Sequence, residues 1–179
     1  MSEPTFLWDC FASLPDPRSP LGRRHPLPAI LSLITVAVLC GARSLEAIAQ
    51  FPRDRGRGFG ALLGFTRPDT PCKASISNLL RRLDIDRFEA AVSAWIAAQR
   101  GERSPREITI DGKTLRGSVD GTVPGVHLLA AYAPDLDVVL AQLRVDCKTN
   151  EHKAALELLK VLPLKGAVVT ADAMFTHAD

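Results

Sequence analysis

The hydrophobic positions in the front half of the chain recur with the spacing of helices rather than that of strands. Residues 27–42, LPAILSLITVAVLCGA, are apolar on nearly all sides and predict the central helix of a small helical domain. Ser44 follows and is placed to cap a short helix over LEAIAQF. The next segment, PRDRGRGFGALLGFTRPDTP, is rich in Gly, Pro and Arg, so it predicts a loop with at most one short turn of helix.

Two further helices are predicted before the pattern changes. One begins at about Ser75 and carries Ile and Leu at helical spacing on one side. Asp86 is predicted to start the second, with Glu89 three residues later completing a capping box. The polar linker GERSPRE comes next, and it marks the predicted boundary between a helical domain over residues 1–104 and a second domain over residues 105–179.

Beyond that boundary the chain shows the alternation and turn signals of strands. EITID is a short strand that ends in an acidic residue, and the turn-rich GKTLRGSVDGTVPG follows it. VHLLAAYA and VVLAQLRV are strands joined by the turn signal Pro134-Asp135. Asn150 is predicted to cap a helix over EHKAALELLKVL, and AVVTA has the pattern of a buried strand. The order strand-strand-strand-helix-strand predicts an α/β chain whose second domain is an incomplete ribonuclease-H-like domain.

Composition indicates a globular protein with an uneven distribution of charge. Hydrophobic residues make up 46% of the 179 residues, and four separated cysteines without a CxxC pair indicate reduced thiols in a cytosolic protein. Residues 1–107 carry 15 Lys and Arg against 11 Asp and Glu, whereas residues 108–179 carry 7 against 9. A basic front beside an acidic back is typical of an anion-binding region joined to a metal-binding one, and unequal solvated surfaces give the same pattern.

The apolar segment 27–42 makes a membrane-associated protein an alternative. The segment is shorter than the roughly 20 residues that a spanning helix needs, and it contains Pro28, Ser32 and Thr35. The start, MSEPTFLWDCF, has no basic region followed by an apolar core, so no secretion signal is visible. We therefore expect a cytoplasmic protein with no membrane partner.

Two aspartates follow predicted strands and are candidates for metal ligands. Asp111 comes directly after Ile110, and Asp172 comes directly after Ala171. If the first and fourth strands are neighbours, both carboxylates lie at one rim of the sheet, where they can hold one or two Mg²⁺ ions of the kind that assist phosphodiester cleavage. Aspartates at strand ends are also common as turn residues and helix caps, and the pattern alone leaves both alternatives open.

Longer motifs are more specific than this acidic pair. They read ITIDGKTLRGS, HLLAAYA, VLAQLRVDCKTNEHKA and LPLKGAVVTADAM, and the front half adds DPRSPLGRRHPLPAILSLITVAVLCGARSLEAIAQF and LLRRLDIDRFE. In sequence and spacing these segments resemble bacterial insertion-sequence transposases of the DDE class, in the branch whose catalytic domain follows a helical transposase-associated region. The resemblance covers residues 14–172, which is almost the whole chain.

The resemblance implies a DNA transposase that cuts and rejoins insertion-sequence ends and has no small-molecule substrate. Asp111 and Asp172 match the first two catalytic acids of the family, which ligate Mg²⁺ or Mn²⁺. The third acid of the family is a glutamate on a helix well beyond the second aspartate, and only AMFTHAD follows here. We therefore expect a C-terminally truncated and inactive fragment, with the metal ion expected only in the complete site.

The main alternative is a non-catalytic DNA-binding or oligomerising fragment that interferes with intact transposase. Basic residues are the candidates for DNA contacts in both cases. Lys113 and Arg116 follow Asp111 inside a family motif and are candidates for contact with a phosphate near the scissile bond. Arg23 and Arg24, with Arg18 and His25, form a basic stretch suited to the DNA backbone. The alternative for each is a solvated surface charge. The resemblance implies association with nucleoid DNA, and a homo-oligomer is left open.

Overall fold

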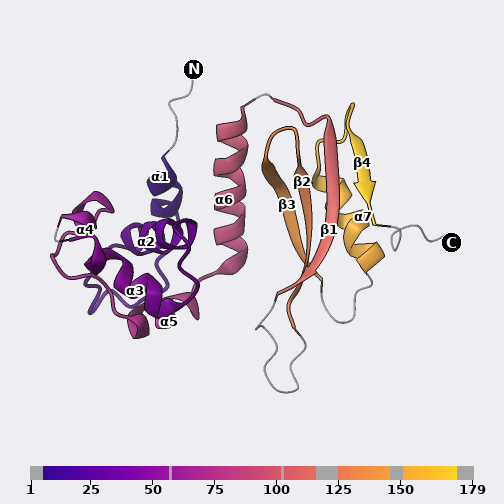
Figure 1. Ribbon diagram of the computed structural model, residues 1–179. Helices are drawn as coiled ribbons and strands as arrows, with labels where there is room; N and C mark the ends of the chain where they lie inside the picture. Colours follow the sequence, from indigo (N-terminus) through magenta and orange to yellow (C-terminus); the bar gives the residue numbers. More distant parts are fainter. Residues whose placement is uncertain (1–5, 57, 102, 116–124, 146–150, 173–179) are drawn as a thin grey trace. The chain divides into compact units, whose positions relative to one another are not determined.

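The chain folds as two separate units, Met1–Gln99 and Arg100–Asp179, in the computed structural model (Figure 1). The structure describes residues 6–56, 58–101, 103–115, 125–145 and 151–172. The division falls at the end of helix α6, whereas the sequence pattern places the boundary after residue 104. Each unit has its own hydrophobic core and is described by itself.

The first unit is helical. Its helices are α1 (Leu7–Ala12), α2 (Leu27–Leu39), α3 (Leu45–Asp54), α4 (Phe59–Leu62), α5 (Lys73–Leu80) and α6 (Ile85–Arg100). Helix α2 is the predicted apolar helix, and its buried residues form the centre of the core: Leu27, Ala29, Ile30, Leu31, Leu33 and Ala37. No helix in the described residues is long and apolar enough to cross a membrane.

Helix caps explain where two of these helices begin. Ser44 precedes α3, and its hydroxyl accepts a hydrogen bond of 3.1 Å from the backbone amide of Ala47, which confirms the predicted cap. For α6 the predicted cap is wrong. The carboxylate of Asp84 accepts the hydrogen bond from the amide of Arg87, at 3.1 Å, so the helix begins at Ile85 and Asp86 lies in its first turn.

Helix α3 also extends further than predicted. The sequence pattern placed Pro52 at the start of a loop, but the helix continues through it to Asp54. Phe51 and Pro52 are both buried, and the guanidinium of Arg55 lies 3.4 Å from the centre of the Phe51 ring. Packing of this last turn against the core therefore outweighs the hydrogen bond that the proline cannot make.

The second unit is a mixed sheet with one helix. Its elements are β1 (Glu107–Thr114), β2 (His127–Ala133), β3 (Val138–Val145), α7 (Glu151–Val161) and β4 (Val168–Ala171), in the order that the sequence predicts. The strand order is β3-β2-β1-β4 (Figure 1). Strand β1 is antiparallel to β2 and parallel to β4. Helix α7 is thus the crossover that returns the chain to the far side of β1.

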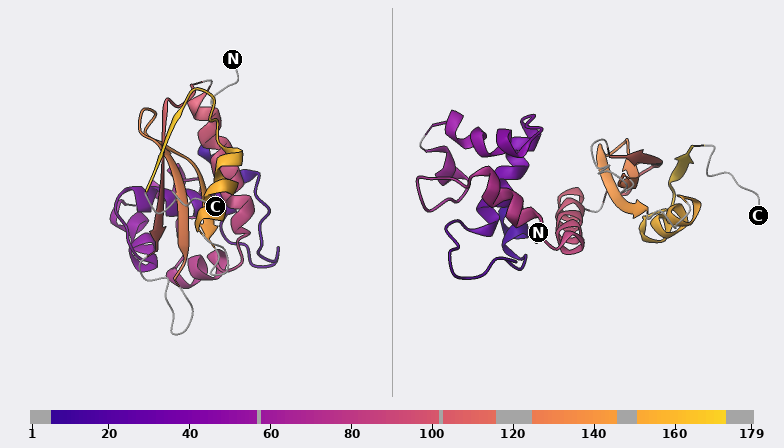
Figure 2. Two further views of the ribbon diagram at one scale, coloured as in Figure 1. Left: turned by 90° about the vertical axis from the view of Figure 1, so that its right-hand side faces the viewer. Right: turned by 90° about the horizontal axis from the view of Figure 1, so that it is seen from below.

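Helix α7 covers one face of the sheet, where it packs over β2 and β3 (Figure 2). The core beneath it includes Ile108 and Ile110 of β1, Leu129 of β2 and Leu158 of α7, all of which are at most 3% exposed. The residue predicted to cap this helix, Asn150, lies outside the described residues.

Strand β4 differs from its prediction as a buried strand. All four of its residues are exposed, with Val168 64% and Val169 40% accessible. The reason is its place in the sheet: β4 is an edge strand, and α7 packs over β2 and β3 instead. An apolar run in the sequence indicates that a segment favours a buried position. Whether the segment is buried depends on which strands the helix covers.

Candidate functional site

The two aspartates predicted as metal ligands lie next to each other at the end of the β1–β4 pair. Ile110 pairs with Ala171 in the parallel register, and Asp111 and Asp172 are the next residues of their strands. Neighbouring strands in a sheet lie about 4.8 Å apart, so adjacent positions bring side chains within reach of one ligand. The adjacency of the first and fourth strands, which the metal-site hypothesis required, is confirmed.

A hydrogen bond shows that both aspartates project from the same face. The hydroxyls of Thr109 and Thr170 lie 3.1 Å apart across β1 and β4. Side chains alternate along a strand, so Asp111 lies on the face of Thr109 and Asp172 on the face of Thr170. That face is opposite to the buried Ile108 and Ile110, so the carboxylates face away from α7.

Strand β1 does not stop at Asp111, contrary to the sequence prediction. It continues to Thr114, and residues 112–114 pair with Leu129, Leu128 and His127 of β2. Asp111 itself lies opposite Ala130, whose methyl group is too short to cover the carboxylate. The site therefore comprises an exposed aspartate within one strand and an exposed aspartate at the end of its shorter neighbour.

The basic residues that follow Asp111 divide into one that the structure describes and one that it does not. Lys113 is exposed and lies two residues after Asp111, so it shares the face of the carboxylates. It stays a candidate for a phosphate contact beside them. Arg116 lies outside the described residues.

Three residues on the opposite face of β1 and β2 were not singled out from the sequence. The hydroxyl of Thr114 lies 2.9 Å from Nδ1 of His127. A Cβ added at Gly112 would lie 3.0 Å from Nε2 of the same ring. The glycine of the DGKT motif thus leaves room for an imidazole that packs against β1 on the face opposite Asp111. The sequence indicates this contact only through a glycine inside a strand, because such a glycine often marks a place where another group approaches the backbone closely.

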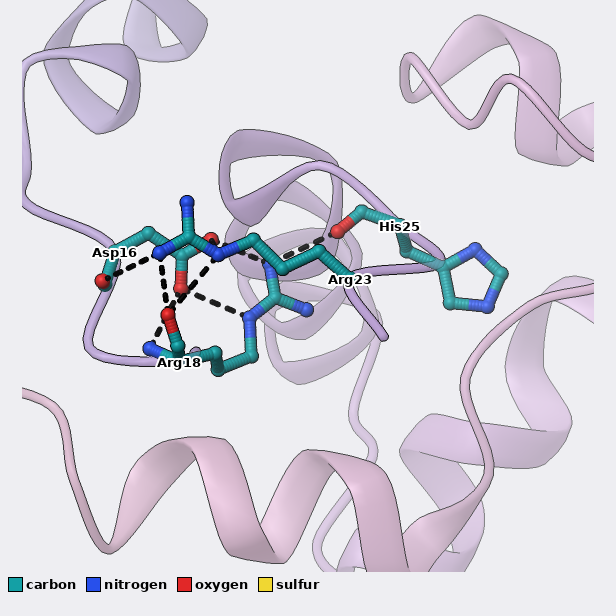
Figure 3. Close-up of polar contacts among 4 residues, drawn as sticks. All are labelled: Asp16, Arg18, Arg23 and His25. Atoms are coloured by element: carbon teal, nitrogen blue, oxygen red, sulfur yellow. Dashed lines mark hydrogen bonds and ion pairs between the residues drawn. The ribbon is translucent and has the colours of Figure 1, made fainter. Parts of the chain in front are cut away.

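The predicted basic stretch of the first unit is engaged in internal contacts (Figure 3). Arg18 makes two hydrogen bonds to the Asp16 carboxylate, from Nε at 2.9 Å and from a terminal nitrogen at 2.8 Å, and it also donates to the carbonyl of His25. Arg23 donates to the backbone carbonyl of Arg18 and lies 3.5 Å from the same carboxylate. Arg24 forms a 2.8 Å ion pair with Asp69. These contacts favour structural roles for Arg23 and Arg24, whose DNA contact stays a prediction.

The electrostatics of that cluster are set by Asp16. Partial burial raises the pKa of the carboxyl group, but hydrogen bonds from Arg18 and the charges of Arg18 and Arg23 outweigh burial and lower the pKa overall. The carboxylate therefore holds together a loop that contributes two arginines.

The carboxylate pair of the second unit can act chemically as an oxygen-donor site. Within the described residues, no group of three or more His, Cys, Asp or Glu side chains is placed to hold a metal ion. Two exposed carboxylates on one face still offer the ligand type that Mg²⁺ and Mn²⁺ prefer, and the remaining coordination positions would be open to water or substrate oxygens.

Comparison with known proteins agrees with the motifs. Residues 8–96 match the family described as DDE_Tnp_1-associated. "Putative transposase YncI" of Escherichia coli (strain K12) is 33% identical over 175 residues, which cover 97% of this chain and 70% of the relative. An "Uncharacterized protein in dhlA 3'region" of Xanthobacter autotrophicus is 33% identical, covering 92% of this chain and 56% of that protein. "H repeat-associated putative transposase YhhI" of Escherichia coli (strain K12) is 30% identical, and the chain spans 46% of its length. No solved structure matches.

Proposed function

Because this chain belongs to the DDE transposase family, in the branch with a transposase-associated region, we propose that it acts in DNA transposition through a metal site containing Asp111 and Asp172. The observation that carries this proposal is the parallel register of β1 and β4, which brings the two aspartates to adjacent positions on one face. They are far apart in the sequence, and an arbitrary pair of aspartates would not meet in this way.

We also propose that the second unit is the beginning of a ribonuclease-H-like domain. The support is the strand order β3-β2-β1-β4, with an antiparallel meander followed by a helical crossover to a parallel strand. In that fold the acids on the first and fourth strands are neighbours, as Asp111 and Asp172 are. The helical first unit then corresponds to the transposase-associated region, in which residues 8–96 match the family model.

The residues on this face have separate roles in the proposed site. The carboxylates of Asp111 and Asp172 hold the ion, and Lys113 on the same face binds a phosphate oxygen of the DNA strand. When bound, Mg²⁺ or Mn²⁺ would activate the attacking oxygen and stabilise the leaving oxygen in phosphodiester cleavage. The small Ala130 beside Asp111 leaves the face open to a DNA strand.

Manganese binding by the 179-residue chain tests the site directly. Because two carboxylates alone hold the ion weakly, we expect weak Mn²⁺ binding by the wild-type chain. Asp111→Asn and Asp172→Asn should each weaken it further, by at least about tenfold, since each removes one of two charged ligands. Glu157→Gln is the matched control: Glu157 is an exposed carboxylate of the same unit and lies on α7 beside Lys160. Equal Mn²⁺ affinity in the wild type and both aspartate variants would reject the metal site.

Duplex DNA carrying an insertion-sequence end tests the reaction. Mn²⁺-dependent nicking that both aspartate variants lose would support a catalytic role of this chain and contradict the expectation of an inactive fragment. DNA binding without nicking, unchanged in those variants, would instead support the non-catalytic alternative, in which the chain occupies DNA ends or associates with intact transposase.

A further inference from the structure

The face of the sheet that carries the two aspartates has no helix of the second unit over it in the described residues. Helix α7 packs over the opposite face (Figure 2). We call the uncovered side the open face. Side chains alternate along a strand, and directly paired residues of neighbouring strands point the same way. The register therefore assigns residues of β1, β2 and β3 to rows that cross the open face, and the row that contains Asp111 has a further row on each side.

The row on one side of Asp111 is cationic. Leu128 of β2 pairs with Lys113 of β1 and with Arg144 of β3, so both cations lie on the open face. Two strand spacings separate their backbones, which is about 10 Å. Both residues are exposed, and no hydrogen bond or ion pair joins either side chain to another of the described residues. Two positive charges beside the proposed metal site are thus available to a ligand.

The row on the other side of Asp111 contains an aromatic ring. Tyr132 of β2 pairs with Thr109, which lies two positions before Asp111, and Tyr132 is 37% exposed. Its hydroxyl donates a hydrogen bond of 2.5 Å to the carboxylate of Asp137, which fixes the position of the ring. An exposed aromatic ring on a sheet provides a surface on which an unpaired base can stack.

Charge complementarity identifies the ligand that this face suits. Successive rows lie about 7 Å apart along a strand, so a ligand that follows β2 meets the cations, the aspartates and the ring in that order. A polyanion brought to two carboxylates is repelled unless positive charge stands close by, and Lys113 and Arg144 supply that charge. An aromatic ring beyond them favours a polyanion that also carries bases. A single DNA strand has both properties.

We propose that the open face binds one DNA strand lengthwise along β2. Arg144 and Lys113 contact phosphates on one side of the aspartate pair, and Tyr132 stacks on a base on the other side. This inference rests on the proposed function, because it describes how the strand to be cut lies across the metal site. It adds Arg144 and Tyr132 to the DNA-binding residues. Neither contact needs a metal ion, so strand binding is measurable without one.

Binding of a labelled single-stranded oligonucleotide to the complete 179-residue chain, in EDTA and over a range of salt concentrations, tests the cationic row. Arg144→Gln should weaken binding at least about fivefold. It should also reduce the slope of log affinity against log salt by about 0.7, the contribution of one phosphate contact on a single strand. Arg144→Lys should keep the slope, because the charge remains.

Arg106→Gln is the matched control for the loss of an arginine. Arg106 is an exposed residue of the same unit that precedes β1 and lies beside Asp135, at the end of β1 away from Lys113. Its oligonucleotide affinity should stay within about twofold of the wild type, as for a distant surface charge. Equal affinity and slope in the wild type and Arg144→Gln would overturn the proposal, and so would equal losses in Arg144→Gln and Arg106→Gln.

Two substitutions of Tyr132 separate stacking from the hydrogen bond to Asp137. Tyr132→Leu removes the ring and should weaken oligonucleotide binding at least about fivefold. Tyr132→Phe keeps the ring and loses only the hydroxyl, so its affinity should stay within about twofold of the wild type. Hydrogen exchange of the β2 amides verifies that the sheet is intact in each variant. Equal affinities of Tyr132→Leu and Tyr132→Phe would overturn the stacking contact.

Asp111→Asn distinguishes a failure of this inference from a failure of the metal site. Without metal, the variant should bind the oligonucleotide at least as tightly as the wild type, because it removes a negative charge from the open face. If Mn²⁺ does not bind but the Arg144 and Tyr132 variants lose affinity as expected, the metal site is wrong and strand binding is supported. If Mn²⁺ binds and those variants keep full affinity, strand binding on this face is wrong.

Discussion

The hydroxyl groups of Thr109 and Thr170 share a hydrogen bond of 3.1 Å between β1 and β4, although the two threonines lie 61 positions apart in the sequence. This contact lies close to the aspartate pair, because each threonine is two positions before one aspartate. It fixes the face on which both carboxylates stand. The position of the proposed metal site therefore depends on the pairing of an edge strand that is only four residues long.

Removal of this contact is expected to loosen β4. Thr109→Val and Thr170→Val keep the side-chain volume but lose the hydrogen bond. Each should lower the free energy of unfolding by about 0.5–1.5 kcal/mol. The double variant should cost less than the two single costs added, because both changes remove one shared interaction. Hydrogen exchange of the β4 amides measures the effect. Thr114→Val is the control, since the Thr114 hydroxyl contacts His127 of β2 and not β4. Equal β4 exchange in the wild type and all four variants would contradict the prediction.

Gly112 is expected to tolerate no side chain without a shift of its neighbour. A Cβ at this position would lie 3.0 Å from Nε2 of His127, a closer approach than side-chain carbons normally make. Gly112→Ala should therefore destabilise the second unit by about 1–2 kcal/mol, as overpacking does elsewhere. Chemical denaturation, with hydrogen exchange of the β1 amides as the readout, measures this change in the free energy of unfolding.

Gly58→Ala provides the reference for that experiment. No atom lies within 4 Å of a Cβ at Gly58, and its φ of −84° is accessible to alanine. Its effect should stay within about 0.5 kcal/mol. An equally small effect of Gly112→Ala would show that the His127 ring moves freely, and the close approach would then have no energetic importance.

Local sequence signals were sufficient for the elements whose causes are local. Residues 27–42 predicted α2 because a helix that is apolar on nearly all sides is most stable at the centre of a hydrophobic core. Ser44 predicted the start of α3, since a cap is a contact between residues three apart. The order of elements in the second unit followed in the same way, from turn signals and changes of period.

Features that depend on partners distant in sequence were not predictable. AVVTA has the composition of a buried strand, but its burial depends on where α7 packs. Strand β1 continues past Asp111 because β2 pairs with residues 112–114. Nothing in the sequence of residues 112–114 indicates that they pair with β2. Arg23 looked available for DNA, whereas its guanidinium contacts the carbonyl of Arg18. The aspartate pair was a hypothesis from sequence, and the register supplied the adjacency it needed.

Acid is expected to weaken the first unit through Asp16. Its pKa is lower in the folded chain than in the unfolded chain, so its stabilising contribution is complete above the unfolded value of about 3.9. The contribution is lost as the pH falls through the lower pKa of the folded state. Asp16→Asn should cost about 1–3 kcal/mol at pH 7, because it leaves two arginines without their carboxylate, and the difference from wild type should shrink in acid.

Tryptophan fluorescence is a specific readout of this change, because Trp8 and Trp95 both pack against the core of the first unit. Asp54→Asn is the matched control: the Asp54 carboxylate is exposed and accepts a hydrogen bond from Gln50 at 2.8 Å. Its effect should be within about 0.5 kcal/mol at all pH values. An Asp16→Asn protein with the same pH dependence as wild type would show that the arginines, and not this carboxylate, hold the loop.

The exposed edge of the sheet predicts aggregation of the second unit when it is separated from the first. Val168 is 64% exposed on β4, which is an edge strand of the sheet that the described residues form. Edge strands present backbone groups that can pair with another chain. Val168→Lys should increase the soluble fraction of residues 105–179, because a charge on an edge strand opposes pairing with another chain. Val161→Lys is the comparison, since Val161 is 71% exposed on helix α7 and its replacement removes the same apolar group away from the edge. Light scattering at increasing protein concentration distinguishes the two variants. If they improve solubility equally, aggregation is driven by total apolar surface; if Val168→Lys alone does so, it proceeds through the edge that also carries Asp172.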